Sequence, residues 1–390
     1  MSESKHFPIR GDGRPLVAVI GAGAIGLSIA WRLAQAGATV DVFERGEAGR
    51  GATWAAAGML AAGVETEPGE ERLLALTRHS QDLWPAFARE LGDETGIDVG
   101  YRDEGTLAVA LNRDDAALLR FSFEFHRKLG IDLEWLDGAR AREREPHLAP
   151  GVVAAVLSPR DHQVDNRQLA LALRAAAIKR GVSVHEHSEA AVEVSGGRAL
   201  GVVVRDKLHR ADVVIVAAGA WTRGVAGLPE RARPPVRPVK GQMVALRMDP
   251  AMPLLRHVIW APKGYLVPRR DGRLLIGATT EERGFDDTLT AGAVMGLIEA
   301  AWRVLPAVEE LPIAEMWTGL RPGSRDDAPI MGPTAIDGLV LATGHHRNGI
   351  LLTPASAEAI AAFVRDDVLP DWAAPFTLAR FARAPERKGA

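Results

Sequence analysis

The chain has 390 residues, of which 47% are hydrophobic and 25% charged, and its formal net charge is −3. This length allows a large core and two domains, and the nearly neutral balance gives no indication of a nucleic-acid partner. The chain contains no cysteine, which excludes disulfides, thiolate metal sites and a cysteinyl-linked cofactor and fits a reducing cytoplasm. No apolar run reaches the roughly 18 residues of a membrane-spanning helix, and residues 1–14 lack the apolar segment of a signal peptide. Residues 1–14 and 380–390 are expected to be unstructured ends.

The first predicted elements form a β-α-β unit. Leu16–Ile20 is an apolar strand that enters a glycine-rich turn, and a helical pattern follows over residues 27–36. A second strand, Thr39–Phe43, ends directly before the acid Glu44. Strand, turn, helix, strand and acid therefore fall in the order of a dinucleotide-binding fingerprint, although an ordinary βα turn remains the alternative.

The chemistry of a dinucleotide explains each residue of this turn. Gly21 permits the tight turn, Gly23 lets the backbone approach a pyrophosphate, and Gly26 lets the helix pack on the strand. The N-terminus of the helix offers N–H groups and partial positive charge to the phosphates, and Glu44 can accept hydrogen bonds from the ribose hydroxyls. The residues predicted to hold the nucleotide here are Gly21, Gly23, Ala24, Ile25, Gly26, Glu44 and Arg45.

The next segment, residues 51–60, is rich in small residues, which let a backbone lie against a flat ring or a phosphate. A flexible linker is the alternative, but Thr53, Trp54 and Met59 are poor linker residues. A run of this kind, ending in Ala-Ala-Ala-Gly-Met-Leu, resembles that of the glycine oxidases of thiamine biosynthesis, within the D-amino-acid-oxidase family. The resemblance implies FAD as cofactor, with contacts from Ala52, Thr53, Ala57, Gly58 and Met59. Relatives that attach flavin through histidine carry that histidine where this chain has Ala55, so the FAD is expected to be non-covalent.

The resemblance extends along the chain. It is carried by Arg78–Ser80, Asp161–Asp165, Ala211–Trp221, Pro238–Gln242, Gly264–Arg269, Gly319–Gly323 and Gly344–Leu352. Asp165 or Asn166 is a plausible N-cap of the helix that follows. Ala190 corresponds to the place where the family's backbone meets the adenine, and Gly219 ends a buried strand that makes a second contact with the flavin nucleotide.

The order of predicted elements indicates an α/β fold with two interleaved domains. Strands and helices alternate over residues 16–60, 152–222 and 338–365, which favours a parallel sheet. Short alternating runs such as Gly105–Ala110 and Arg273–Gly277 favour antiparallel strands, with helices predicted over 114–129 and 291–305. We expect a Rossmann-like FAD-binding domain from residues 15–85, 152–225 and 318–386, and a substrate domain, mainly an antiparallel sheet, from 86–151 and 226–317. A pocket is expected where the two meet.

Three side chains are candidates for the substrate side. Arg321, in Gly-Leu-Arg-Pro-Gly, corresponds to the family's carboxylate-binding arginine, and a guanidinium holds a carboxylate bidentately; a surface arginine in a turn is the alternative. Tyr265 corresponds to a tyrosine whose hydroxyl lies over the substrate, but it could also be a half-buried sheet residue. Arg347 could reach the substrate or pair with a neighbouring acid.

A loop near the C-terminus completes the predicted cofactor site. Leu339–Ala342 is a predicted strand and a helix is predicted to begin at Ile350, so the loop between them can present N–H groups at a helix N-terminus. The resemblance places this loop at the N1–C2 carbonyl edge of the flavin, where reduction adds negative charge. The two histidines are expected to act through backbone atoms or packing. The predicted contacts are His345, His346, Arg347, Asn348, Gly349, Ile350 and Leu351.

The resemblance implies an FAD-dependent glycine oxidase that acts on glycine and similar small amino acids with dioxygen, in the cytoplasm, as a homotetramer, without metal. It would supply glycine imine for the thiazole of thiamine. A dehydrogenase that passes electrons to a quinone or partner subunit carries the same motifs and remains open. A non-catalytic flavoprotein subunit would have no use for Arg321 and Tyr265, and a nicotinamide enzyme would not need the run over 51–60.

Overall fold

The computed structural model describes residues 14–382. The expectations for residues 1–13 and 383–390 lie outside the described residues. The described residues fall into two compact units. Residues 14–50, 173–237 and 322–382 form the first unit, and residues 51–172 and 238–321 form the second unit. The expectation of an unstructured end is wrong for residues 380–382, because the Arg380 guanidinium contacts both carboxylate oxygens of Asp326, at 2.8 and 2.9 Å.

The first unit is built on a six-stranded sheet in the order β18-β19-β12-β1-β2-β8. All neighbouring strands are parallel except β18 and β19, which are antiparallel. Most of these strands are buried apolar runs, as expected for strands covered on both faces. Their bounds are β1 Leu16–Ile20, β2 Thr39–Phe43, β8 Ser183–His185, β12 Val213–Val216, β18 Ile330–Pro333 and β19 Leu339–Thr343.

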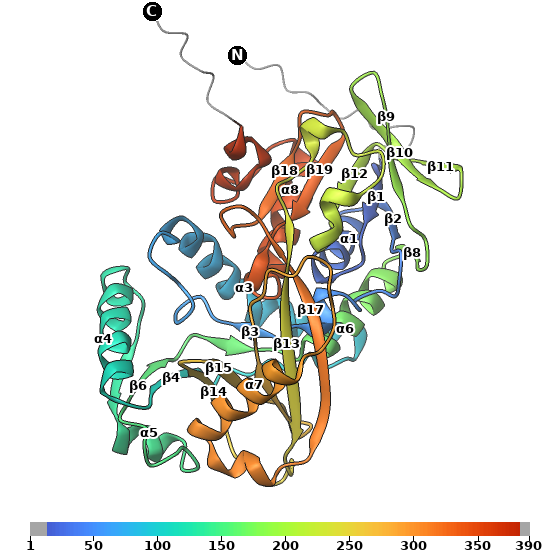
Figure 1. The fold of residues 1–390 in the computed structure, drawn as a ribbon. Helices are drawn as coiled ribbons and strands as arrows, with labels where there is room; N and C mark the ends of the chain where they lie inside the picture. The colour runs from blue at the N-terminus through green and yellow to red at the C-terminus, as the bar shows by residue number, and fades with distance from the viewer. Residues whose placement is uncertain (1–13, 383–390) are drawn as a thin grey trace, which may run out of the picture. The chain divides into compact units, whose positions relative to one another are not determined.

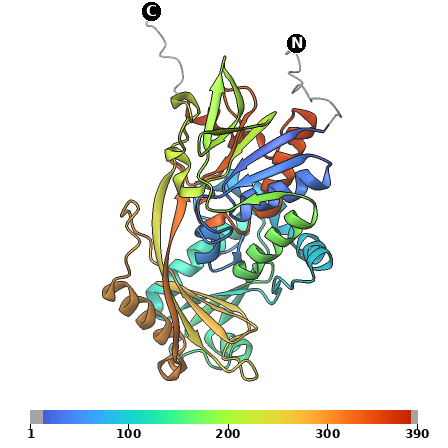
Figure 2. The same cartoon turned by 90° about the vertical axis from the view of Figure 1, so that its right-hand side faces the viewer.

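Helices and a small second sheet complete the first unit (Figure 1). The helices α1, Ala24–Gln35, and α8, Thr353–Asp366, pack against each other. The three-stranded antiparallel sheet consists of β9 Ala191–Ser195, β10 Arg198–Val204 and β11 Lys207–Arg210 and projects as the green hairpins in Figure 2. Short 3₁₀ turns are η1 Gly219–Gly224, η2 Glu230–Ala232, η4 His346–Asn348, η5 Ala374–Phe376 and η6 Leu378–Phe381.

The second unit is built on an eight-stranded, mainly antiparallel sheet in the order β17-β13-β16-β15-β14-β4-β6-β5. One pair, β14 with β4, is parallel. One large core cluster joins this sheet to α7 through apolar side chains such as Leu107, Ile259 and Leu297. The strands are β4 Thr106–Ala110, β5 Glu134–Asp137, β6 Ala154–Ser158, β13 Arg237–Arg247, β14 Val258–Ala261, β15 Gly264–Pro268, β16 Arg273–Gly277 and β17 Ile313–Gly323.

Helices and a two-stranded ladder lie beside this sheet. The ladder pairs β3, Met59–Leu60, with β7, His162–Gln163. The helices and the 3₁₀ turn are α2 Ala52–Ala55, α3 Glu71–Thr95, α4 Arg113–Lys128, α5 Gly138–Arg144, α7 Ala291–Val304 and η3 Pro306–Glu310, and α6, Asn166–Lys179, runs from the second unit into the first.

The predicted α/β class is confirmed, and two expectations need correction. The strand β6, Ala154–Ser158, lies in the antiparallel sheet of the second unit and not in the parallel sheet. Its alternation is hidden because both of its faces are buried: Val156 packs against Phe123 of α4, while Leu157 belongs to the large core cluster. The last helix begins at Thr353 and not at Ile350, after a 3₁₀ turn and with a proline in its first turn.

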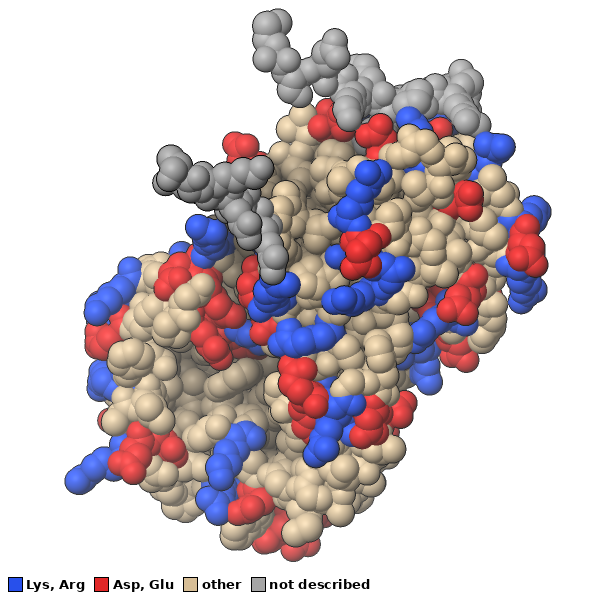
Figure 3. All heavy atoms as spheres, turned by 45° about the horizontal axis from the view of Figure 1, so that its top comes forward, with Lys and Arg blue, Asp and Glu red and all other residues tan. Residues whose placement is uncertain are grey.

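The charged side chains are mixed in sign. On the face shown in Figure 3, Lys and Arg alternate with Asp and Glu. Over residues 14–382, no helix combines the length and the apolar character that crossing a membrane requires.

Candidate functional site

The glycines of the first turn bring three elements of the first unit into close contact. Gly21 has a φ of +106°, and a Cβ built on it would lie 2.4 Å from the carbonyl oxygen of Ala217 after β12. A Cβ on Gly26 would lie 1.9 Å from the carbonyl oxygen of Gly21. No side chain larger than hydrogen fits at either position, so the turn and α1 can lie this close to β12 only with glycine.

The N-terminus of α1 fits an anionic ligand. Gly23 is the N-cap in an extended conformation and, as a glycine, supplies no side-chain cap of its own. The first turn contains Ala24, Ile25 and Gly26, and the N-terminal turn of a helix carries the backbone N–H groups and the partial positive charge that bind phosphate oxygens. This donor set matches the pyrophosphate of a dinucleotide.

Glu44 already holds the turn together. Its carboxylate accepts the backbone N–H of Ala22 at 2.9 Å and that of Gly46 at 3.0 Å. Each carboxylate oxygen can accept a further hydrogen bond, so two ribose hydroxyls can still be bound. Arg45 is exposed, and its guanidinium lies 4.2 Å from the ring centroid of Trp221 as a cation–π contact.

Two further predicted contacts, Ala190 and Gly219, also lie in the first unit. Ala190 is buried beside β9 in the core cluster that includes Phe43. Gly219 has a φ of +55° and begins η1, and, apart from the glycine and its two chain neighbours, no atom of residues 14–382 lies within 4 Å of the position that its Cβ would occupy. Its carbonyl oxygen accepts the hydroxyls of Thr222 and Thr343 at 2.8 and 3.2 Å. The strand end is therefore fixed beside open space.

The C-terminal loop is fixed by its own side chains. His345 is buried, and its Nε2 lies 2.9 Å from the hydroxyl of Ser356; burial lowers the pKa of His345 to about 3, so it is neutral. His346 adopts a φ of +46°, with its Nδ1 3.8 Å from Asp327. Asn348 is buried, and its carbonyl accepts the N–H of Leu352 at 2.8 Å. Half-buried Arg347 lies in η4, and Gly349, Ile350 and Leu351 form the turn before α8.

The small-residue run lies in the second unit. Ala52, Thr53 and Ala55 are in the one-turn helix α2, and Met59 begins β3. The run is held by Trp317, whose indole N–H donates to the carbonyl of Ala55 at 3.0 Å. A Cβ on Gly319 would lie 2.3 Å from the Cβ of Ala55, so β17 passes against this position with no room for larger residues.

Two residues of the site were not predicted from the sequence. Asn166 donates from its Nδ2 to the carbonyls of Thr53 and Trp54 at 2.8 and 2.9 Å. Arg269 donates to the carbonyl of Ala57 at 2.5 Å. Of the two predicted N-cap candidates, Asp165 takes the role, because its Oδ1 accepts the N–H groups of residues 167 and 168 at 2.9 and 3.1 Å. The sequence does show that Asn166 is a polar residue next to the N-cap, but nothing in the sequence predicts that its side chain contacts residue 53.

The substrate candidates Arg321 and Tyr265 lie together in the second unit. Nη1 of Arg321 donates to the carbonyls of Thr279 and Lys240 at 3.1 and 3.4 Å. A Cβ on Gly241 would lie 2.6 Å from this nitrogen, so the glycine makes the space for the guanidinium. Burial raises the pKa of Tyr265, while the nearby charge of Arg321 opposes that rise.

Apolar and sulfur-containing side chains surround Tyr265. Its ring is stacked on Trp260, with centroids 5.7 Å apart, and its hydroxyl lies 3.5 Å from the sulfur of Met243. Ala57 and Trp317 belong to the same cluster. The second unit therefore brings a cation, a phenol and the small-residue run together around an apolar wall. Arg347 belongs to the first unit, as do the glycine turn and Glu44.

The parallel sheet, the glycine turn before α1 and the acid after β2 define an α/β protein that binds a dinucleotide. The family model described as FAD dependent oxidoreductase matches residues 17–363. The chain belongs to this family and is an FAD-dependent enzyme.

Individual relatives are similar over nearly the whole chain. The glycine oxidase of Geobacillus kaustophilus is 36% identical over 367 residues, which cover 93% of this chain and 96% of the relative. A crystal structure of glycine oxidase from Geobacillus kaustophilus superposes with a TM-score of 0.85 at 36% identity, over 95% of this chain and 99% of that one. The bifunctional protein ThiO/ThiG of Trichormus variabilis is 35% identical over 94% of this chain, which corresponds to 55% of the relative.

Proposed function

We propose that this protein is a glycine oxidase. The observation that carries the proposal is the position of Arg321: Nη1 of its guanidinium donates to two backbone carbonyls, and the group lies beside Tyr265 and an apolar wall. A guanidinium held in this way can bind a carboxylate. The similarity to glycine oxidases over more than nine-tenths of the chain supports an amino acid as the source of that carboxylate.

In this proposal Arg321 binds the substrate carboxylate and Tyr265 borders the amine and Cα. Bound FAD would supply the redox chemistry by accepting a hydride from Cα, and dioxygen would take the two electrons as hydrogen peroxide. The protein orients the C–H bond and keeps water away from it. The amino acid leaves as an imine, which either hydrolyses to the 2-oxo acid and ammonia or supplies thiazole synthesis for thiamine.

Residues of the first unit would hold the FAD in this proposal. The N-terminus of α1 would bind the pyrophosphate and Glu44 the ribose hydroxyls. Gly219 and the turn from His345 to Leu351 would contact the rest of the nucleotide. The small-residue run of the second unit would contact the flavin, without a covalent bond because residue 55 is alanine.

Anaerobic spectroscopy tests the substrate and the acceptor together. Purified yellow protein is mixed with glycine, sarcosine or D-alanine without oxygen, and air is then admitted. We expect bleaching near 450 nm with glycine and recovery of colour with hydrogen peroxide in air. Colour that glycine bleaches but air does not restore would identify a dehydrogenase, and no bleaching by any of the three would reject the proposal.

Acid precipitation tests the mode of attachment, because non-covalent FAD moves entirely into the supernatant and covalent flavin stays in the pellet. The homotetramer and the cytoplasmic location remain predictions from the resemblance and from the cysteine-free composition. Light scattering and cell fractionation test them.

A further inference from the structure

A cluster of polar side chains is buried in the second unit behind the small-residue run. Gln163 of β7, Asn166 at the start of α6 and Arg269 after β15 are 2%, 2% and 5% exposed. We call these three side chains the Arg269 cluster. Polar groups buried to this extent cost stability unless they are hydrogen-bonded, so their partners indicate what the cluster does.

Two side chains of the cluster, those of Arg269 and Asn166, donate hydrogen bonds to backbone carbonyls of the run. Nη1 of Arg269 donates to Oε1 of Gln163 at 2.9 Å, and its Nη2 donates to Oδ1 of Asn166 at 3.1 Å and to the carbonyl of Ala57 at 2.5 Å. Asn166, which accepts from Arg269, in turn donates from its Nδ2 to the carbonyls of Thr53 and Trp54. Three carbonyls between residues 53 and 57 are therefore fixed by side chains that lie more than 100 residues away in sequence.

This contact also sets the direction of a peptide N–H. In a planar trans peptide the carbonyl and the following N–H point in opposite directions. Since the carbonyl of Ala57 points at Arg269, the N–H of Gly58 points away from it. Gly58 has a φ of +70°, and a Cβ there would lie 2.0 Å from the carbonyl oxygen of Val164 and 2.8 Å from Nη2 of Arg269. Glycine is thus required first by the closeness of the Val164 carbonyl and also by that of Arg269.

The cluster also contains a buried positive charge. Among the described residues, the guanidinium of Arg269 has hydrogen bonds to amide and peptide oxygens, and its Nε has no partner. The charge of Asp165 acts to raise the pKa of Arg269, but the carboxylate of Asp165 forms its ion pair with Arg273, at 2.5 Å. Burial lowers the pKa of Arg269 to about 10, so the group remains cationic at neutral pH. A buried cation without a direct carboxylate partner is costly, which favours an anionic group of a ligand as its counterpart.

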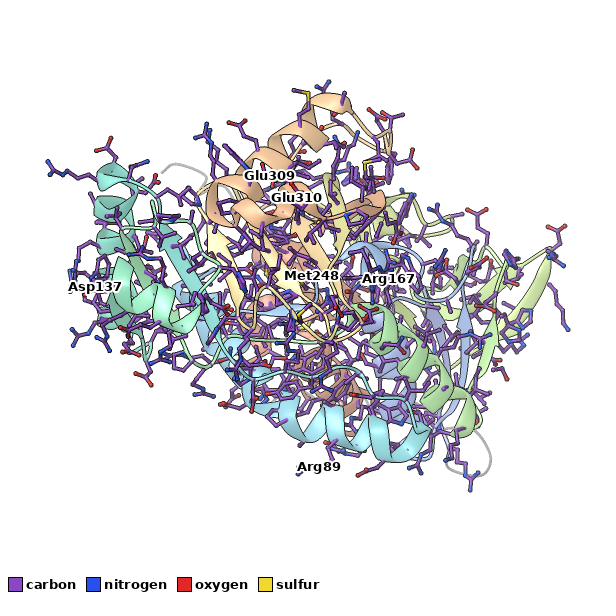
Figure 4. All side chains as sticks on the ribbon, turned by 90° about the horizontal axis from the view of Figure 1, so that it is seen from below. Arg89, Asp137, Arg167, Met248, Glu309 and Glu310 are labelled. Carbon is purple, nitrogen blue, oxygen red and sulfur yellow. The ribbon has the colours of Figure 1, made fainter. Side chains whose placement is uncertain are left out.

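A neighbouring arginine shows the contrasting case. Arg167, labelled in Figure 4 at the start of α6, forms a bidentate pair with Glu315 at 2.7 and 2.9 Å, and its guanidinium carbon lies 4.7 and 4.9 Å from the ring centroids of Trp54 and Trp317. Its charge is neutralised within the protein. Arg269 is more deeply buried than Arg167, and its charge has no direct carboxylate partner among the described residues.

We propose that Arg269 is a positioning residue for the FAD. Through Asn166 and Ala57 it fixes the run over 53–58 with the Gly58 N–H directed at the cofactor, and its buried charge favours the anionic, reduced state of the flavin. This inference rests on the proposed placement of the run beside FAD, and it does not depend on glycine being the substrate.

Titration of the apoprotein with FAD tests the positioning role. We expect Arg269→Met and Asn166→Ala each to weaken FAD binding by at least tenfold, and Arg269→Lys to recover only part, because an ammonium cannot reproduce the planar fork. Arg270→Met is the matched control: this neighbour is 60% exposed and pairs with Asp98, so FAD binding should stay within twofold of the parent. Parent-like binding by folded Arg269→Met, or by Asn166→Ala if the former does not fold, would overturn the role.

The flavin midpoint potential tests the charge. Measured against a redox dye, Arg269→Met should lower the potential, while Arg269→Lys and Asn166→Ala, which keep the cation, should stay near the parent. A change in stability alone would not sort the variants by charge. Equal potentials in the parent and Arg269→Met would overturn the electrostatic part. Parent protein that binds FAD but is not reduced by glycine would reject the proposed function and leave both of these tests intact.

Discussion

The glycine turn of the first unit and the arginine clamp of the second unit are assembled in different ways. In the turn, Glu44 accepts the N–H of Ala22, 22 positions earlier, and both groups belong to one βαβ unit. In the clamp, Arg321 contacts carbonyls 42 and 81 positions away, on segments that only the register of the sheet brings together. A local motif carries its geometry in its own sequence, whereas the clamp depends on the packing of strands β13, β15, β16 and β17.

This difference predicts that substitutions in the two regions affect different properties of the enzyme. Substitutions in the turn should weaken FAD binding, because the groups there bind the cofactor and hold one another. Substitutions in the clamp should leave FAD bound and affect the substrate. The following experiments test that separation.

The largest effect is expected from Arg321→Ala. The variant should keep its FAD but lose about 2–5 kcal/mol in kcat/KM for glycine, because a charged pair in a largely dry site is removed. Arg321→Lys should recover only part. Stopped-flow reduction of the flavin without oxygen measures this, with the exposed Arg303→Ala on α7 as control. Parent-like reduction by Arg321→Ala would move the clamp to Arg347.

Glu44→Ala tests the turn. Loss of its hydrogen bonds to the ribose, together with those to Ala22 and Gly46, should weaken FAD binding by about 1.5–3 kcal/mol. Titration of the apoprotein measures the dissociation constant. The exposed Glu47→Ala, whose partner is Arg50, serves as control. An unchanged constant for Glu44→Ala would mean that this acid only caps the strand end.

Gly241→Ala tests whether the space beside Arg321 matters. The added Cβ would lie 2.6 Å from Nη1, so the guanidinium must move, at a cost of about 1–3 kcal/mol. We expect a raised half-saturation for glycine with unchanged FAD binding. Gly296→Ala on α7 is the control, since nothing lies within 4 Å of its Cβ position. Equal half-saturation in both variants would show that the clamp tolerates the shift.

The smallest effect concerns the C-terminal loop and pH. Burial lowers the pKa of His345 to about 3 from an ordinary value near 6.5, so the unfolded chain binds a proton that the folded chain does not. Stability should therefore fall by about 1.4 kcal/mol for each pH unit below about 6.5, and level off as pH rises above it. Urea unfolding of the parent and His345→Gln at pH 7.5 and 5.5 measures the difference between them. Identical pH dependence in the two proteins would contradict the buried neutral state.

The sequence by itself determined the features that depend on neighbouring residues. The β-α-β unit, the acid at the end of its second strand, an N-cap at Asp165 or Asn166 and most helix positions follow from apolar periodicity and turn chemistry, which act over a few residues. The α/β class was predicted for the same reason. The family resemblance added FAD, because its motifs recur in order along the chain.

Only the tertiary structure decided which segments meet. The strand β6 was predicted in the parallel sheet but lies in the antiparallel sheet. A strand buried on both faces has no alternation of apolar and polar residues that would indicate its sheet. The tertiary structure also placed Gly241 under Arg321, and Arg269 and Asn166 behind the run over 53–58, contacts that span from 80 to more than 200 positions. Such contacts leave no local pattern, because they arise from strand register and from buried polar groups that must find partners wherever the chain brings them.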